Sequence, residues 1–331
     1  RRFNDSDIYQ QIFDEIVLQA MQRKLVSGTV LYTDSTHLKA NANKGKWIKA
    51  HAVSERQAYM DKLDQAIEED RLAHGKKPLP PPSSEPQVRE IKQSTTDPES
   101  GFMTRDNKPK GFFYLDHRTV DTKANIITDV HVTAGNVHDA VPYLARLERQ
   151  TQRFGFNVQY VGLDAGYHTT AISKGVEEKG VKAVFGYRRP IHRQGYLRKR
   201  EFIYIAETDQ YVCPQGQALI YSTTNREGYR HYVSDPAVCR QCPLLSRCTQ
   251  NAKQQKTVTR HVWENSRERQ DANRLTPWGK AIYQRRKETV ERSFADAKEL
   301  HQYRYARYRG RHKVQAQCLM TAAAQNIKKI A

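Results

Sequence analysis

Apolar residues along the chain follow a period that changes from helical to β-type. Ile8, Ile12 and Ile16 lie four residues apart, and residues with this spacing share one face of an α-helix. We therefore expect a helix over residues 7–25. The run that follows, at 29–34, is short and rich in β-branched residues, which is typical of a strand.

Further β-type runs follow this first one along the chain. They lie at residues 112–116, 126–132, 158–164 and 181–187. Helical patterns at 136–152 and 168–179 separate the last three runs. The order strand, strand, strand, helix, strand, helix, strand predicts an α/β domain with a mixed five-stranded sheet flanked by helices. The first three strands would form an antiparallel meander.

Two segments interrupt this pattern. Residues 43–110 combine a charged helical stretch with a Pro-rich run and read as an insertion. Residues 188–276 are basic and hold four of the five cysteines, so they read as a second insertion. The helical period returns in 279–300 and 311–330, so we expect 277–331 to complete the core that begins at 29–187.

The charge balance adds a class of partner. The 331 residues carry 55 Lys and Arg against 36 Asp and Glu, a net formal charge of +19. A surplus of this size favours a polyanion such as nucleic acid, although a basic soluble protein without such a partner is the alternative. No apolar run approaches the roughly 20 residues that span a bilayer, and no signal peptide opens the chain. We expect a cytoplasmic protein without a membrane partner.

Three acidic residues are candidates for catalysis. Asp34 and Asp164 each end a predicted strand, where ligand sites of such sheets tend to lie, although either residue alone could cap a helix or a turn. Glu291 borders the apolar stripe of a helix that packs on the sheet. Together the three carboxylates would favour Mg²⁺ or Mn²⁺, and two such ions suit phosphodiester chemistry. The alternative is a surface helix with paired charges.

The residues around these acids resemble the DDE transposases of bacterial insertion sequences, which have an RNase H-like catalytic core. Residues 32–42 resemble the first Asp motif of that family, and 162–167 resemble the second. The family's Tyr-Arg-Glu-Lys signature is matched by Tyr283, Arg286, Glu291 and Lys298. Four residues separate Arg286 from Glu291, where one large branch of the family has three.

The resemblance implies a role for each matched residue. It makes Asp34, Asp164 and Glu291 the ligands of Mg²⁺ or Mn²⁺. It places Arg286 and Lys298 on DNA near the cleaved phosphate. Further DNA contacts are expected from Tyr283 and from Arg292 in the same basic helix. Other acids are expected to be structural, namely Asp97, Asp116, Asp121 and Asp139, the last as the cap of the following helix.

The resemblance also implies an activity and a setting. The activity is metal-dependent cleavage at the ends of an insertion sequence, followed by strand transfer into target DNA. A homodimer on DNA, in the cytoplasm and nucleoid of a bacterium, is implied as well. Residues 1–28 would be the remnant of a longer N-terminal region. Two alternatives remain: a nuclease of the same fold without strand joining, or an inactive zinc-stabilised DNA-binding remnant of a transposase.

The cysteines of the second insertion predict a separate metal site. Cys213, Cys239, Cys242 and Cys248 have the spacing C-x25-C-x2-C-x5-C. Thiols of a cytosolic protein stay reduced, and four thiolates suit structural Zn²⁺. An iron–sulfur cluster and thiols without a metal remain alternatives. Cys318 lies in an apolar helical stretch and is expected in the core.

Overall fold

The computed structural model describes residues 6–53, 59–81, 88–104, 110–191 and 193–331. The chain forms two compact units. The first combines residues 1–55, 86–187 and 266–331, and the second combines 56–85 and 188–265. Each unit is described by itself.

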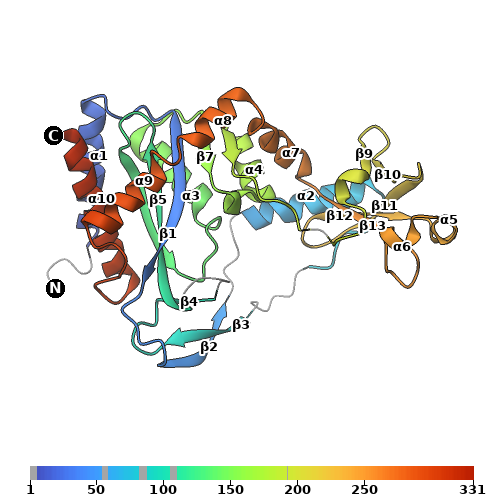
Figure 1. The fold of residues 1–331 in the computed structure, drawn as a ribbon, viewed down its shortest axis with the longest axis horizontal. Coiled ribbons are helices and arrows are strands. Elements are labelled where there is room, and N and C mark those ends of the chain that lie inside the picture. Colours follow the sequence, from blue (N-terminus) through green and yellow to red (C-terminus); the bar gives the residue numbers. More distant parts are fainter. Residues whose placement is uncertain (1–5, 54–58, 82–87, 105–109, 192) are drawn as a thin grey trace. The chain divides into compact units, whose positions relative to one another are not determined.

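A mixed sheet forms the centre of the first unit (Figure 1). Its strands are β1 (Val30–Lys39), β4 (Gly101–Met103), β5 (Gly111–Asp121), β6 (Ile127–Ala134), β7 (Tyr160–Leu163) and β8 (Lys182–Phe185). β5 pairs antiparallel with β1 on one side and with β6 and β4 on the other. β7 and β8 extend the sheet beyond β1 in parallel. The predicted five-stranded mixed sheet is confirmed, and β4 adds a sixth strand.

Helices cover both faces of this sheet. One group packs together and against β1, β5 and β6: α1 (Ile8–Gln22), α9 (Val290–Leu300) and α10 (Arg311–Ile330). The other group is α3 (Tyr143–Phe154) and α4 (Thr170–Glu178), on the other side of the sheet in Figure 1. Every residue of β5 is buried, as expected for a strand covered on both faces. α8 (Pro277–Gln284) packs against β7 and β8, and α7 (Glu264–Asn273) precedes it.

Several predicted elements differ in extent from those that form. The helical pattern at 279–300 is split by a turn at 285–289 between α8 and α9. The helix expected from residue 136 begins only at Tyr143, after a turn. The hydrophobic pattern did not indicate the two-stranded sheet of β2 (Trp47–Val53) and β3 (Val88–Ser94). The helix expected at 311–330 forms as α10.

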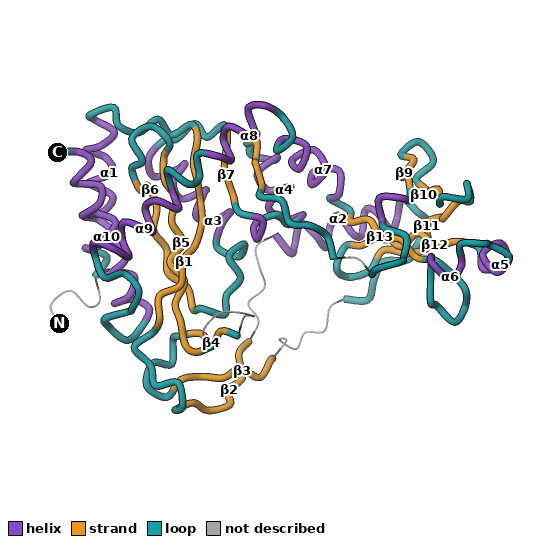
Figure 2. Tube along the Cα trace, in the orientation of Figure 1, coloured by secondary structure: helices purple, strands orange, loops and turns teal. Residues whose placement is uncertain are grey.

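The second unit is built on a five-stranded antiparallel sheet. Its strands follow chain order: β9 (Ile203–Ile205), β10 (Gln210–Val212), β11 (Ala218–Thr224), β12 (Tyr229–Ser234) and β13 (Thr257–His261). Two short helices, α5 (Pro236–Arg240) and α6 (Leu245–Cys248), lie between β12 and β13. Figure 2 shows how the chain alternates between strands and loops here.

α2 (Tyr59–Ala73) belongs to this second unit although it is far away in sequence. Its Asp70 is buried and forms an ion pair with Arg230 of β12 at 2.5 Å. Arg71 donates to the carbonyl of Thr224 in β11 at 2.8 Å. Part of the first predicted insertion therefore folds together with the second one. No helix in the described part of the chain is long and apolar enough to cross a membrane.

Candidate active site

Asp34 lies in the middle of β1, the central strand of the sheet. It stands opposite Arg118 of β5, and directly opposed residues of an antiparallel pair point to the same face. Arg118 is fully buried and donates to the Ser293 carbonyl of α9 and to Gln325 of α10, at 3.4 and 2.8 Å. The face that carries Asp34 is therefore the face on which α9 and α10 pack.

Asp164 follows the last residue of β7. Thr33 pairs with Leu163 in the parallel β1–β7 ladder, so Asp34 and Asp164 are the next positions on two adjacent strands, which run about 4.8 Å apart. The Asp164 side chain makes no capping hydrogen bond to the short 3₁₀ turn Ala165–Tyr167 and is 53% exposed. A purely structural role as a helix cap therefore does not account for it.

Arg286 joins these two acids to the third one. Its guanidinium contacts Asp34 at 2.7 Å, Asp164 at 3.7 Å and Glu291 at 3.7 Å. The arginine is only 3% exposed, whereas the Glu291 side chain is 45% exposed. Two oxygens that lie 3.7 Å from one nitrogen can be at most twice that distance apart. The acids predicted from sequence therefore converge around one buried cation.

The helix that carries Glu291 is positioned by the predicted apolar stripe. Val290, Phe294 and Ala297 of α9 are all buried in the core. Glu291 lies in the first turn of this helix, where the positive end of the helix dipole favours a carboxylate. The turn at 285–289 brings Arg286 back toward the sheet. The same fold thus fixes both the acid and its neutralising partner.

The electrostatics of the site are dominated by the burial of Asp34. Burial is the largest of the effects that together raise the pKa of this carboxyl to about 6: Arg286 and the Ser35 amide lower it, and the charges of Asp164 and Asp139 raise it. Burial opposes the charge of Arg286, but the carboxylates of Asp34, Asp164 and Glu291 leave its pKa raised. One arginine therefore faces an excess of negative charge.

Asp139 is a neighbour of this acidic cluster, although it was expected from the sequence to cap the following helix. Its carboxylate accepts from the Ser35 hydroxyl at 2.8 Å, next to Asp34. It does not cap α3, whose N-cap residue is Pro142, so that expectation is wrong. Ser35 directly follows the first acid of the motif. The position of Ser35 directly after Asp34 is the only feature of the sequence that could have indicated the Ser35–Asp139 contact, because Asp139 itself is more than a hundred residues away.

Tyr283 packs against the guanidinium of Arg286. Its hydroxyl accepts from Arg286 at 3.2 Å, and the ring centroid lies 5.3 Å from the guanidinium carbon. Gly186, just after β8, makes room for it: a Cβ on this residue would lie 2.5 Å from the Tyr283 hydroxyl. The tyrosine therefore supports the arginine from the side of α8.

Two other residues of the predicted DNA-binding set lie along α9. Lys298 is half-buried in its last turn. Arg292 is 70% exposed and pairs with Asp296 at 2.8 Å. The remaining acids serve the fold. Asp116 accepts from buried Arg118, Asp121 from the amides of Ser27 and Gly28, and Asp97 from the Tyr114 hydroxyl.

The four cysteines of the insertion come together in the second unit. Cys213, Cys239, Cys242 and Cys248 all line one cavity of about 180 Å³. Burial raises the pKa of the Cys248 thiol, and the other three sulfurs raise it further. Cys213 begins a tight turn in which the Gly216 amide donates to its carbonyl. Cys318 is buried in the core of the first unit, as expected.

The donor chemistry of the two clusters differs. The acids offer only carboxylate oxygens, which suit a hard divalent cation, and the cysteines offer only sulfur, which suits a soft one. Within the described residues, no three His, Cys, Asp or Glu side chains are spaced closely enough to hold an ion as they stand. At the acidic cluster, the guanidinium of Arg286 lies between the carboxylates.

Comparison with known proteins points to one family over part of the chain. Residues 212–331 match the family model described as a transposase DDE domain, which confirms the resemblance over this segment. The match includes Glu291, the signature residues around it and all four clustered cysteines. It does not reach Asp34 or Asp164. No curated protein matches the chain.

One solved structure is similar over about half of the chain. It is the crystal structure of the Mos1 mariner paired end complex with Mn, at 14% sequence identity and a TM-score of 0.22. The similarity covers 53% of this chain and 40% of that one. The chain thus spans less than half of the length of that protein.

Proposed function

Because its C-terminal third matches a transposase DDE domain, we propose that this chain is a DNA transposase. The observation that carries the proposal is the convergence of Asp34, Asp164 and Glu291 around Arg286. These residues come from two adjacent strands and one helix, in the order of the family's three acids. The matched segment supplies only the third acid, so the sheet is what joins the other two to it.

The proposed chemistry is cleavage and transfer of a DNA strand. Asp34, Asp164 and Glu291 would hold Mg²⁺ or Mn²⁺, which when bound activates an attacking hydroxyl and stabilises the leaving oxygen. The excess of carboxylates over Arg286 supports this assignment, because divalent cations offset such charge. The Ser35 amide donates to the Asp34 carboxylate, and the Ser35 hydroxyl donates to Asp139.

The basic residues near the cluster would bind the substrate. Arg286 is paired with the acids, so we propose that it reaches a phosphate only when the carboxylates are neutralised by cations. Arg292 is exposed on the first turns of α9, beside Glu291, and suits a contact with the flanking backbone. Tyr283 holds Arg286 in place, and Lys298 extends the cationic face of the helix. The partners would be the ends of the element and target DNA, bound by a homodimer in the bacterial cytoplasm.

A strand-transfer assay tests this function. Purified protein would be mixed with a labelled, pre-cleaved end of its own element, a supercoiled target plasmid and Mg²⁺. We expect joined products with the wild type and none with Asp164→Asn or Glu291→Gln, while Glu288→Gln, an exposed acid of the same segment, remains active. Metal-dependent cleavage without joining would assign the nuclease instead. Neither activity, with DNA binding retained, would indicate an inactive remnant.

For the cysteine cluster we propose a structural Zn²⁺. Four thiols converge on one cavity next to the small apolar core of the second unit, where Cys213 and Cys248 pack. Four thiols crowded together at partial burial would repel one another once ionised, and a tetrahedral Zn²⁺ removes that penalty. An iron–sulfur cluster is distinguished by its visible absorption.

A further inference from the structure

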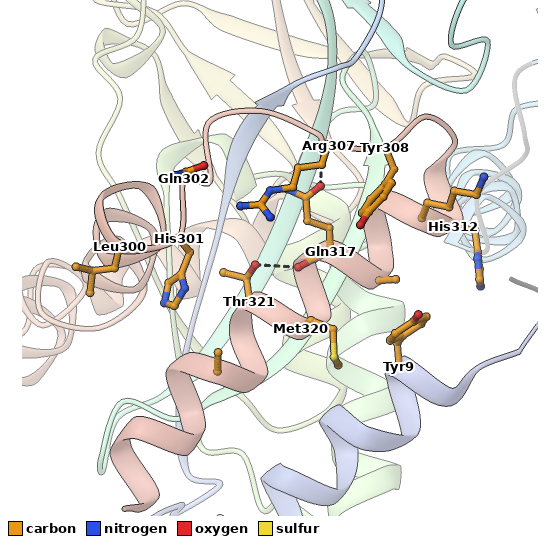
Figure 3. A pocket seen from close by; sticks show the side chains of 13 residues that line it. Tyr9, Leu300, His301, Gln302, Arg307, Tyr308, His312, Gln317, Met320 and Thr321 are labelled. Carbon is orange, nitrogen blue, oxygen red and sulfur yellow. Dashed lines mark hydrogen bonds between the residues drawn. The ribbon is translucent and has the colours of Figure 1, made fainter. Parts of the chain in front are cut away.

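A hollow on the first unit lies away from the acidic cluster, on the outer side of α10. It has a volume of about 710 Å³ and is bounded by α1, by α10 and by the segment between α9 and α10 (Figure 3). Its floor is the outward face of α10, which carries Ala316 and Met320. Tyr9 of α1 stands on one side and Tyr308 on the other. We call this hollow the α10 groove.

The wall formed by residues 301–310 is rigidly held. Tyr303 is buried and donates its hydroxyl to Asp116 at 2.7 Å. Ala306 is also buried, and its amide donates to the carbonyl of Lys39 at the end of β1. Gln317 of α10 accepts from the Arg307 amide at 2.9 Å. Tyr303 and Ala306 are the buried residues of this wall, three positions apart. The residues between and directly after them, at 304–305 and 307–309, are exposed.

The outward residues of this segment are basic or aromatic. Between residues 301 and 313 the chain has five Lys and Arg, two His and three Tyr, and no acid. Arg307, His312 and Lys313 line the groove, and none of the three forms an ion pair among the residues that the structure describes. The Tyr308 side chain is 53% exposed. The groove therefore offers cations and a free aromatic face, with no acid among its lining residues.

This combination matches the chemistry of one ligand class. Proteins bind single-stranded nucleic acid with a cationic groove that follows the phosphates and with aromatic side chains on which bases stack. A volume of this size is in the range of roughly 300–1,000 Å³ that encloses a compact organic ligand, which suits one or two nucleotides better than a duplex. An acidic peptide would use the cations but would leave the aromatic faces without a matching partner.

We infer that the α10 groove binds an unpaired segment of DNA, with Tyr308 stacking on a base and with Arg307 and Lys313 on its phosphates. The inference rests on the proposed function, which makes DNA the substrate. The groove begins at Leu300, the last residue of α9, and Glu291 is nine residues earlier. At 1.5 Å per residue this is about 14 Å, within reach of a strand that passes the acidic cluster.

Binding of labelled oligonucleotides tests the inference. Fluorescence anisotropy would measure the dissociation constant of a 12-nucleotide oligo-dT and of a 12-base-pair duplex, without added Mg²⁺ so that no cleavage occurs. We expect Tyr308→Ala to weaken oligo-dT binding about fivefold or more, because one stacked base contributes ~1–3 kcal/mol. Tyr308→Phe should retain the wild-type constant. Arg307→Glu combined with Lys313→Glu should weaken binding at least tenfold and lower the salt dependence by about 1.4, or ~0.7 per lost phosphate contact.

Arg23→Glu is the charge-reversal control, since Arg23 is exposed at the far end of α1 and its replacement makes the same change of charge as each of the two groove substitutions taken singly. It should stay within twofold of the wild type. If the groove variants also stay within twofold, or lose no more affinity than Arg23→Glu, the inference is wrong. Tighter binding of the duplex than of oligo-dT would contradict it as well. Equal unfolding temperatures establish that the variants fold.

The proposed transposase function and the proposed α10 groove can be tested independently of each other. Asp164→Asn should bind oligo-dT like the wild type, because the groove does not include the acids. If strand transfer and cleavage are both absent but the groove variants behave as expected, the groove stands and the transposase assignment falls. If strand transfer is present and the groove variants bind normally, only the groove assignment falls.

Discussion

Arg286 is the residue on which the arrangement of the acids depends. It is almost fully buried, and its guanidinium contacts Asp34, Asp164 and Glu291. A buried ion pair is costly to form, but removing one partner is costlier, because the other charge is left uncompensated. The family resemblance implies a contact of this arginine with DNA. In the structure, the turn that interrupts the predicted helix directs it toward the acids.

Replacement of Arg286 should expose the repulsion among the acids. We expect Arg286→Ala to lower the free energy of unfolding by about 2–4 kcal/mol at pH 7, less than the ~3–5 kcal/mol of a fully buried pair, because Asp164 and Glu291 are about half exposed. Adding Mg²⁺ should restore more stability to this variant than it adds to the wild type, because the cation would replace the lost positive charge. Urea unfolding with and without Mg²⁺ measures both effects.

Arg292→Ala is the control for this experiment. Its ion pair with Asp296 is exposed, and such pairs contribute about 0–1 kcal/mol. If Arg286→Ala is no less stable than Arg292→Ala, or if Mg²⁺ has the same effect on the variant and the wild type, the acids are not compensated as described.

The β5–β6 hairpin should make the stability of the fold depend on pH, although it does not belong to the candidate active site. His117 and His131 are directly opposite each other on these strands, with ring centroids 6.2 Å apart. Burial, together with the charges of His131 and Arg146, lowers the pKa of His117 to about 3. Burial, followed by Arg146, lowers the pKa of His131 to about 4. Both imidazoles are therefore neutral in the folded protein at neutral pH.

This lowering has a definite sign for stability. Unfolded histidine titrates near pH ~6.5, so the unfolded chain takes up protons below that value while the folded hairpin does not. The contribution of these two histidines to stability should be constant above pH 6.5 and should fall as the pH decreases toward 4, whereas the raised pKa of Asp34 acts in the opposite direction below about pH 6. His117 alone would contribute a loss of about 2 kcal/mol at pH 5. Denaturant unfolding at several pH values measures the slope.

His117→Asn should flatten this pH dependence, and His51→Asn should not. His51 is an exposed residue of β2 and serves as the control. An unchanged slope in His117→Asn would show that other groups cause the acid lability.

At the scale of elements, periodic hydrophobic patterns predicted helices and strands, whereas features without such a pattern were missed. Alternating or continuous apolar runs indicated β1 and β5–β8, and the stripe on α9 placed Glu291 correctly. The split between α8 and α9 was missed because residues 285–289 are all compatible with a helix, and the interruption coincides with the tertiary ion pairs of Arg286. β2 and β3 were missed because their side chains are largely polar or exposed.

For the whole molecule, the division into units could not be obtained from sequence order. Two segments separated by more than a hundred residues, 56–85 and 188–265, form one unit. Their joint fold depends on ion pairs such as Asp70–Arg230, which composition cannot reveal. The prediction that Asp34 ends a strand was wrong, because β1 continues to Lys39, but the acids still group because Asp34 and Asp164 follow paired residues of the adjacent strands β1 and β7. The α10 groove was not, because its walls come from both ends of the chain.

Loss of Zn²⁺ should destabilise the second unit alone. Its only tryptophan is Trp263, which is largely buried, so a Trp47→Phe/Trp278→Phe variant reports on this unit by fluorescence. We expect a chelator, or Cys239→Ser, to lower the temperature of the Trp263 transition, because metal binding energy is folding energy. Cys318→Ser is the cysteine control for the binding of Zn²⁺. Equal metal content in Cys239→Ser and the wild type would contradict the proposed site.

The proposed catalytic centre requires that Asp34, Asp164 and Glu291 form one site for divalent cations. Electron paramagnetic resonance of Mn²⁺ measures the free ion directly and requires no knowledge of the DNA ends. We predict that the wild type and Glu288→Gln deplete the free Mn²⁺ signal equally, and that Asp164→Asn and Glu291→Gln each lose most of this binding. Equal Mn²⁺ binding by all four proteins would contradict the assignment of Asp34, Asp164 and Glu291 as the catalytic centre.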